Sequence, residues 1–366
     1  MDQETAKKLF DHGAVLVFLD VPVGTEFGID FCSWNTGEKF MGIKMIPPGI
    51  HFIYYSAVSK EGATAPRTGH FHNFSKQELV VWKWNAAEED IIESGDEEEK
   101  ARLKADLKNL DKNLGPYPYE SWKQWVSLSN RININILQKV EPENKKIVSV
   151  ADLIPCEKPA IEGASPAKRV RTKDKETSLL PEMQARPGTG INFTKFPEAL
   201  YPEGSSASDV TRCNLDTSFV LGHLFSQWEK PEDLLGELQV AFVCFLVGQV
   251  YGAFEQWKNL VHAICSADEM LLKNPKFFIG FIEDLYFQMK EVPSDFFIDI
   301  LSSENFLVKT FRIFFDNVLN NVNIDAPLRK RCGQFKDYVT QRFQWDFDVE
   351  PDDEAPVVVE DLEIPE

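Results

Sequence analysis

The chain contains 366 residues, of which 43% are hydrophobic, and carries a formal net charge of −19 at pH 7. This length predicts about two domains with substantial cores. The charge is uneven, because residues 88–99 hold eight acids and residues 345–366 hold ten, with no base in either segment. The rest of the chain contains the other 40 of its 58 acidic residues and all 39 of its basic residues. We therefore expect nearly neutral folded bodies, an acidic loop and an acidic tail, and no direct binding to nucleic acid or to a membrane.

The cysteines and the start of the chain indicate a reducing compartment. The six cysteines are scattered without a Cys-x-x-Cys pair, which favours neither a zinc site nor a disulfide framework. The first four residues are acidic or polar apart from Met1, unlike a secretory signal. The longest apolar run, residues 240–247, is too short to span a bilayer. We expect the protein in the cytoplasm and nucleus.

The first part of the chain has the pattern of short strands. Residues 14–19 form a continuous apolar run, and residues 50–58 follow a stiff Pro-Pro-Gly turn. Alternation in residues 78–84 places three apolar side chains on one face: Val80, Trp82 and Trp84. Short strands with no helix between them predict an antiparallel sandwich or barrel.

Helices are predicted after these strands. Residues 96–114 have leucines at three- and four-residue steps and end at Gly115-Pro116, where a helix stops. Residues 121–128 predict a second helix, with Trp122 and Trp125 expected in the core. The predicted N-terminal domain, residues 1–155, is thus mainly β and sandwich-like, with appended helices.

A flexible linker is predicted over residues 156–190. Apolar periodicity is lost there and prolines recur. The basic cluster Lys168-Arg169-Val170-Arg171 has the composition of a nuclear-import signal, although linkers also carry such runs without that use.

The predicted C-terminal domain, residues 191–345, is all-α. Leu307, Phe311 and Phe314 belong to one of several apolar stripes with helical spacing. Short-linked helices with such stripes predict a helical bundle. The predicted helices cover residues 215–226, 233–249, 252–265, 278–289, 295–301, 307–318 and 328–339.

The acidic tail, residues 346–366, contains the β-branched run Val357-Val358-Val359 after Pro356. An extended apolar segment can add to the exposed sheet edge of another chain through backbone hydrogen bonds. The alternative is a frayed terminus that packs weakly on its own body. The candidate partner-binding residues are Trp345, Phe347, Val357, Val358, Val359, Leu362 and Ile364.

Enzymatic chemistry has one weak candidate in the sequence. The usual nucleotide-binding, hydrolase and zinc-protease motifs do not occur. His70 and His72 alternate on a predicted strand, with Glu78 downstream, much as in a cupin metal site. Five residues separate His72 from Glu78, where the cupin motif has three or four. His51 lies in an apolar strand and is interpreted as a structural residue. No catalytic, cofactor-binding or metal-binding residue is assigned, so the cupin-like metal-dependent enzyme remains only an alternative.

Several stretches resemble the A1-cistron splicing factor family (Aar-two) along the whole chain and in the same order. They are residues 24–30, 44–52, 114–119, 235–239, 241–246 and 345–347. The differences from the family concentrate in residues 88–99 and 156–190, the segments predicted above to be loop and linker.

The resemblance implies a non-enzymatic assembly factor, or chaperone, of the U5 small nuclear ribonucleoprotein (snRNP). Members bind the large scaffold protein of the spliceosome, at its RNase H-like and MPN-type domains, within a cytoplasmic precursor particle. They thereby keep the particle's RNA helicase from binding too early, and they leave during nuclear maturation. The family fold is similar to the one predicted here, with a C-terminal tail that bridges partner domains as an added strand.

Overall fold

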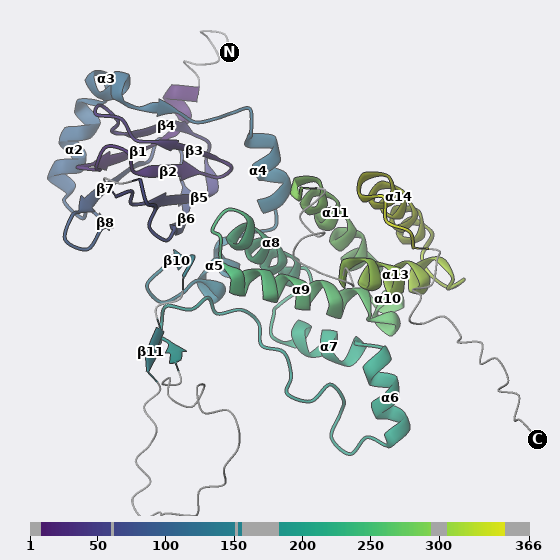
Figure 1. The fold of residues 1–366 in the computed structure, drawn as a ribbon. Helices are drawn as coiled ribbons and strands as arrows, with labels where there is room; N and C mark the ends of the chain where they lie inside the picture. The colour runs from purple at the N-terminus through teal and green to yellow at the C-terminus, as the bar shows by residue number, and fades with distance from the viewer. Residues whose placement is uncertain (1–8, 60–61, 151–152, 156–182, 294–305, 348–366) are drawn as a thin grey trace, which may run out of the picture. The chain divides into compact units, whose positions relative to one another are not determined.

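The computed structural model describes residues 9–59, 62–150, 153–155, 183–293 and 306–347. These residues belong to two compact units. The first unit is Met1–Thr194 with Gly236–Trp257, and the second is Lys195–Leu235 with Lys258–Glu366. Most elements of the two units are labelled in Figure 1.

The first sheet of the first unit has the strand order β8-β7-β1-β4-β9. Its strands are β1 (Ala14–Leu19), β4 (Gly42–Ile46), β7 (Leu79–Asn85), β8 (Asp90–Glu93) and β9 (Gly115–Pro116). The central strand β1 is buried along nearly its whole length, as its continuous apolar run predicts. It pairs antiparallel with β4 but parallel with β7, so the sheet is mixed.

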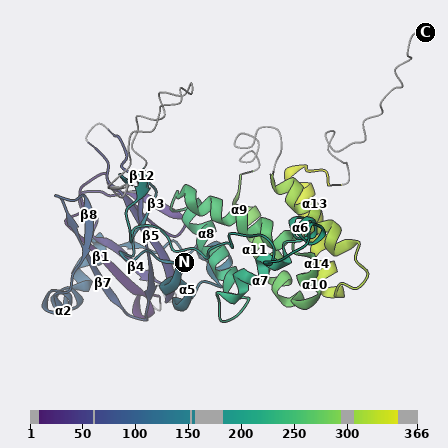
Figure 2. The ribbon, with the colours of Figure 1, turned by 90° about the horizontal axis from the view of Figure 1, so that it is seen from below.

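The second sheet is antiparallel throughout, with the order β10-β6-β5-β2-β3. Its strands are β2 (Glu26–Ile29), β3 (Cys32–Asn35), β5 (Gly49–Ser56), β6 (Thr68–Phe74) and β10 (Ile147–Val148). Side chains from both sheets share one core, in which the rings of Phe18 and Phe27 lie 5.6 Å apart. Strands β3 and β5 are labelled in Figure 2, and all five strands in Figure 1. The predicted mainly β, sandwich-like fold is confirmed.

The alternation in β7 divides its side chains between two cores. Val80, Trp82 and Trp84 lie in the core between the sheets, as predicted. Val81 points to the other face, where it joins leucines of the following helical segment. The period of two in a strand gives this division directly.

The helix predicted over residues 96–114 is interrupted. It divides into α2 (Glu97–Ala105), α3 (Leu107–Leu110) and the 3-10 turn η1 (Asp111–Asn113). The break lies at Asp106, whose side chain accepts a hydrogen bond from Asn109. Aspartate competes with the helical backbone through such local bonds, which favours a helix boundary.

The prediction that residues 88–99 form a loop was wrong for residues 90–93, whereas the helix start predicted at residue 96 is confirmed. Asp90–Glu93 form β8, and α2 begins after Asp96, whose side chain accepts hydrogen bonds from the backbone of Glu98 and Glu99. Acids in the first turn of a helix are stabilised by its dipole, so a dense acidic run is compatible with a helix start.

Two further helices, α4 (Trp122–Ser129) and α5 (Ile134–Val140), complete the N-terminal part of this unit. Trp125 is buried as expected, whereas Trp122 is 40% exposed. Strands β11 (Leu153–Pro155) and β12 (Met183–Ala185) pair antiparallel, and β12 lies within the predicted linker. Residues 156–182, which include the basic cluster, lie outside the described residues.

Helix α8 (Asp233–Leu246) and the start of α9 (Tyr251–Cys265) belong partly to the first unit. Gly236 makes this packing possible, because a Cβ there would lie 2.1 Å from Ile136 Cδ1 and 2.8 Å from the Arg131 carbonyl oxygen. Gln239 accepts from the Arg131 backbone N–H at 2.8 Å and donates to Asn130 Oδ1 at 2.8 Å. These contacts fasten α8 to the segment between α4 and α5.

The buried carboxyl group of Glu237 binds the segment that follows β12 through hydrogen bonds. Glu237 is fully buried and accepts from the Thr194 backbone N–H at 3.0 Å and from Gln256 Nε2 at 2.8 Å. Burial raises the pKa of Glu237, while the bonds from Thr194 and Gln256 oppose that rise. Arg67 of the β part also donates to the Val247 carbonyl at 2.6 Å. Residues 236–257 are therefore integral to the first unit.

The second unit is helical in its described residues. Besides the rest of α8 and α9, it contains α6 (Ala207–Leu215), α7 (Ser218–Ser226), α10 (Asp268–Lys273), α11 (Pro275–Glu291), α13 (Phe306–Leu319) and α14 (Ala326–Phe343). The stripe on α13 is buried, and Phe311 packs against Phe335 of α14 with ring centroids 5.4 Å apart. The predicted helical C-terminal part is confirmed, while the helix predicted over residues 295–301 lies outside the described residues. Of the helices described, none combines the length and apolarity needed to cross a bilayer.

Candidate partner-binding site

The residues that follow α14 pack through their aromatic rings on Phe343 at the end of α14 and on helix α13. The Trp345 ring stacks on Phe343, with centroids 4.6 Å apart. Phe347 is 6% exposed and meets Phe315 edge-on at 4.9 Å. Arg312 donates from Nε to the Phe347 carbonyl at 3.4 Å and from Nη2 to the Asp346 carbonyl at 3.3 Å. The start of the tail is therefore fixed to the helical unit by both ring packing and backbone contacts.

The remaining candidate residues of the tail cannot be placed. Val357, Val358, Val359, Leu362 and Ile364 lie outside the described residues, so their role stays a prediction. The partner-binding role of Trp345 and Phe347 also stays a prediction, although both rings pack on this chain's own helices.

An exposed apolar patch lies on α4 and α5 of the first unit. Trp122 and Val126, one turn apart on α4, are 40% and 38% exposed, and Ile134 at the start of α5 is 44% exposed. All three line a groove of about 380 Å³ that also includes Pro48 and Ile50 at the start of β5. Neighbouring exposed apolar side chains in a groove are typical of surfaces that bind other proteins.

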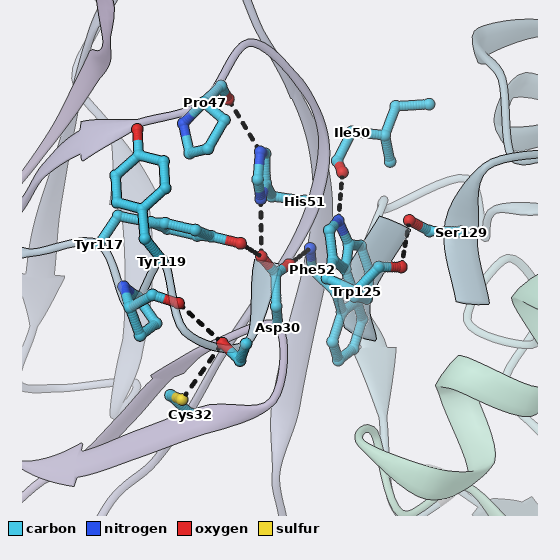
Figure 3. A network of polar contacts seen from close by, with 12 residues as sticks. Asp30, Cys32, Pro47, Ile50, His51, Phe52, Tyr117, Tyr119, Trp125 and Ser129 are labelled. Carbon is cyan, nitrogen blue, oxygen red and sulfur yellow. Dashed lines mark hydrogen bonds and ion pairs between the residues drawn. The ribbon is translucent and has the colours of Figure 1, made fainter. Parts of the chain in front are cut away.

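A buried polar network adjoins this groove, and two of the residues drawn, His51 and Trp125, also line it (Figure 3). The Asp30 carboxylate accepts from Tyr117 Oη–H at 2.6 Å and from the Phe52 backbone N–H at 3.1 Å. It also lies 2.7 Å from His51 Nδ1. Burial, together with the neighbouring Asp30, raises the pKa of Tyr117, so this phenol stays a donor. On the groove side, Trp125 Nε1 donates to the Ile50 carbonyl at 2.9 Å.

His51 in this network has no nitrogen left for catalysis. Its Nε2 lies 2.8 Å from the Pro47 carbonyl oxygen, while Nδ1 faces Asp30. Both ring nitrogens are thus engaged by partners within the protein. The side chain is 2% exposed. The arrangement ties the Pro-Pro-Gly turn to β5 and the loop before α4, which agrees with a structural role.

His70 and His72 line one cleft of the first unit, the β6–α5 cleft, whose volume is about 760 Å³. His72 Nε2 lies 3.3 Å from Glu78 Oε1, so this pair is present as an ion pair or hydrogen bond. Within the described ranges, however, no three His, Cys, Asp or Glu side chains gather as a metal ion requires. The geometry therefore gives the cupin alternative no support.

The His70 ring is held in one orientation. It lies parallel to Tyr55 at 6.1 Å and tilted against Trp82 at 5.4 Å. Burial lowers the pKa of His70 to about 4, so the ring is neutral at physiological pH. Its Nε2 is buried and makes no hydrogen bond.

Glu141 stands at the end of α5 in the same cleft. Its backbone N–H donates to Leu137, and its carbonyl accepts from Asn192 Nδ2 at 3.0 Å. Burial raises the pKa of the Glu141 carboxyl to about 7, with Lys145 opposing that rise. Its Oε1 is buried without a hydrogen-bond partner. The sequence gives no signal for this site, because the environment of Glu141 depends on a strand far away in the chain.

Comparison with known proteins gives matches over nearly the whole chain. The AAR2 N-terminal domain family matches residues 12–142, and the AAR2 C-terminal repeat region matches residues 193–348. "Protein AAR2 homolog" of Homo sapiens is 42% identical over 372 residues, covering 98% of this chain and 97% of the relative. The Caenorhabditis elegans homolog is 38% identical, covering 94% and 97%. "A1 cistron-splicing factor AAR2" of Saccharomyces cerevisiae is 23% identical, covering 83% and 84%. These matches confirm the resemblance noted in the sequence: the chain belongs to the AAR2 family.

Proposed function

We propose that this protein is a non-enzymatic assembly factor of the U5 snRNP in pre-mRNA splicing. The observation that carries the proposal is the family match, which includes both parts of the chain. The yeast relative is named a splicing factor, and the names of the matched relatives denote no enzyme. The absence of a free catalytic histidine at His51 and of a gathered metal site among the described residues is compatible with this proposal.

The proposed partner is the large U5 scaffold protein, bound through its RNase H-like and MPN-type domains. By occupying these domains in a cytoplasmic precursor, the protein would keep the RNA helicase of the particle from binding early. It would leave after the particle has entered the nucleus. The specific partner follows from the family resemblance, whereas the means of binding is argued from this chain.

Strand addition by the tail is the proposed means of binding. The valine run 357–359 follows a start that Phe347 and Arg312 hold against α13. A fixed start reduces the entropy that a tail loses when it binds, because fewer residues search for the partner. The backbone would supply affinity and the valines would fill side-chain positions on the partner's sheet. The acids around the run would mainly speed encounter with a basic surface.

A proline substitution separates strand addition from charge attraction. Val358→Pro removes one backbone donor in the middle of the run and leaves net charge unchanged. We expect it to weaken binding to the recombinant RNase H-like and MPN-type domains by about tenfold or more, since it removes one hydrogen bond and distorts its neighbours. Val358→Thr is the matched control, because it keeps the donor and the β-branched shape, and should bind within a few-fold of wild type.

Isothermal titration calorimetry with the full-length chain provides the measurement. Equal affinity of the proline variant and wild type would show that the tail does not bind as a strand. No binding of the wild-type chain to either domain would refute the proposed partner itself. Affinity capture from cytosolic extract with the wild-type chain, followed by mass spectrometry, should recover U5 snRNP proteins.

A further inference from the structure

The described start of the tail runs along α13 at the pace of an extended chain. The Trp345 ring lies 6.3 Å from Phe311, and the Phe347 ring lies 4.9 Å from Phe315, about one turn further along the helix. Four helical residues rise about 6 Å, and two extended residues cover about 6–7 Å. Each second residue of the tail therefore meets the next turn of α13, in the direction of the connection to α14.

The sequence continues this pattern beyond the described residues. From residue 345 to residue 352 apolar residues alternate with acids, in the order Trp-Asp-Phe-Asp-Val-Glu-Pro-Asp. On an extended chain, Val349 would share one face with the two anchored rings. The next position on α13 in steps of four is Leu319, which is half-buried. Val322, in the connection that follows, is 84% exposed. Apolar surface is thus available where the apolar face of the tail would come next.

Helices α13 and α14 run in opposite directions. Arg329, near the start of α14, donates from Nη2 to the Asn321 carbonyl just after the end of α13, at 2.5 Å. Phe335, further along α14, meets Phe311 in the first half of α13. A tail that follows α13 toward its end therefore passes back along α14 toward its beginning.

Basic side chains of α14 lie ahead of the tail on this path. The helix holds five bases and one acid, and its first turn contains no acid. Positions 329, 336 and 343 are seven residues apart, so they form one row on the helix. Trp345 stacks on Phe343, the last member of this row. Lys336 and Arg329, the other two members, follow in the direction that the tail takes.

The acids of the tail match these bases in number of steps. Residues 348–366 hold nine acids and no base. Lys336 precedes Phe343 by about 10 Å along α14, which three extended residues cover, so Asp348 comes level with Lys336. Arg329 precedes Phe343 by about 21 Å, which six to seven extended residues cover, so Asp352 comes level with Arg329. Opposite charges therefore fall at matching positions.

We propose that residues 348–352 of the free protein form an extended strap along α13 and α14. Val349 packs on Leu319, and Asp348 pairs with Lys336. The chain's own tail is the occupant because its fixed start gives it a high effective concentration on this surface. The strap brings the remainder of the tail out near residues 320–325. It does not depend on the proposed scaffold partner, and the experiments use the free full-length chain.

Photochemical cross-linking tests where the strap lies. Benzoylphenylalanine in place of Val349 should cross-link within one chain to residues 319–322, which mass spectrometry of the digested protein would locate. The same photoreactive residue in place of Ile364, beyond the strap, is the control. It should give several-fold less of this cross-link.

Charge reversal tests which residues pair. Lys336→Glu should lower the yield of the Val349 cross-link about two- to fivefold at low salt, the range of one surface ion pair. Asp348→Lys should have the same effect and changes a residue outside the folded unit. Combining the two substitutions restores opposite charges and should recover the yield. Lys230→Glu, an exposed position between α7 and α8, is the control and should leave the yield unchanged.

Three results would overturn the strap. They are a Val349 cross-link outside α13 and its connection to α14, a cross-link that joins two copies of the chain, and single charge variants that both cross-link like wild type. Because no partner is present in these experiments, such a failure would leave the proposed assembly function standing. Failure of the scaffold protein to bind would, in turn, leave the strap standing.

Discussion

The raised pKa of Glu141 predicts that Glu141→Gln stabilises the protein at pH 8 but not near pH 4.5. Burial lifts this pKa from the usual 4.5 to about 7 in the folded state. Between these two pH values the folded state holds a proton that the unfolded state has released. The stability contributed by the protonated carboxyl is therefore fully present below pH 4.5 and is lost as pH rises to about 7. Glutamine stays neutral and avoids this loss.

The size of the effect follows from the pKa difference. At about 1.4 kcal/mol for each tenfold change in proton affinity, the rise to about 7 gives an upper limit of about 3 kcal/mol. Glu141 is only half-buried, and solvent screens part of this free energy. We expect the variant to gain about 1–2 kcal/mol at pH 8 and to be within about 0.5 kcal/mol of wild type near pH 4.5.

Urea unfolding followed by tryptophan fluorescence measures both values. With a slope near 2–3 kcal/mol/M, the midpoint of the variant at pH 8 should rise by about 0.5 M. Glu143→Gln is the matched control, because it removes the same charge from an exposed neighbour in the same segment. It should give no pH-dependent gain. A Glu141→Gln variant that is equally stabilised at both pH values, or destabilised at pH 8, would refute the role of the buried carboxyl.

Two further predictions concern residues 236–257. Gly236→Ala should destabilise the protein by about 1–3 kcal/mol, because the new Cβ overlaps Ile136 and the Arg131 carbonyl. Thermal unfolding measures this loss of stability. Gly252→Ala on α9 is the control, because a Cβ there meets nothing within 4 Å. Trypsin should cut first within the basic residues 168–175, and the two fragments should co-elute in gel filtration, because residues 236–257 belong to the same unit as the N-terminal part. Separate elution would contradict the integral packing of α8.

The sequence predicts elements whose signal is local. The apolar run of β1 and the alternation in β7 place their side chains correctly because burial follows the period of the strand. The stripe on α13 is equally local, since its helical spacing places Phe311 and Phe314 on one buried face. In contrast, the acidic composition of residues 88–99 gives no sign of strand β8, because its formation depends on pairing with β7 and on contacts of Asp90 with Tyr55 and Lys146.

The parts that the sequence does not predict arise from long-range contacts. Gln239 reaches Asn130 and Arg131 more than a hundred residues earlier in the chain. Neither amphipathic spacing nor composition marks that pairing, so α8 is predicted only as part of a helical domain. The β6–α5 cleft is missed for the same reason, because the environments of His70 and Glu141 come from segments separated by 71 positions. Side-chain chemistry can be read locally, whereas burial of a charged group depends on the assembled fold.

The anchor at Phe347 limits where the proposed strand addition can take place. Nine residues lie between Phe347 and Val357, which makes ten residue-to-residue steps, and an extended chain spans at most about 3.6 Å per step. The partner's sheet edge must therefore lie within about 36 Å of the Phe347 position on α13. Once the folded units are bound to the partner, a tail of this length keeps a high effective concentration near the partner's sheet edge. The acidic residues of the tail add electrostatic attraction but do not determine which residues pair. Body and tail would thus bind one partner assembly together, with the rigid anchor setting the reach and the valines setting the register.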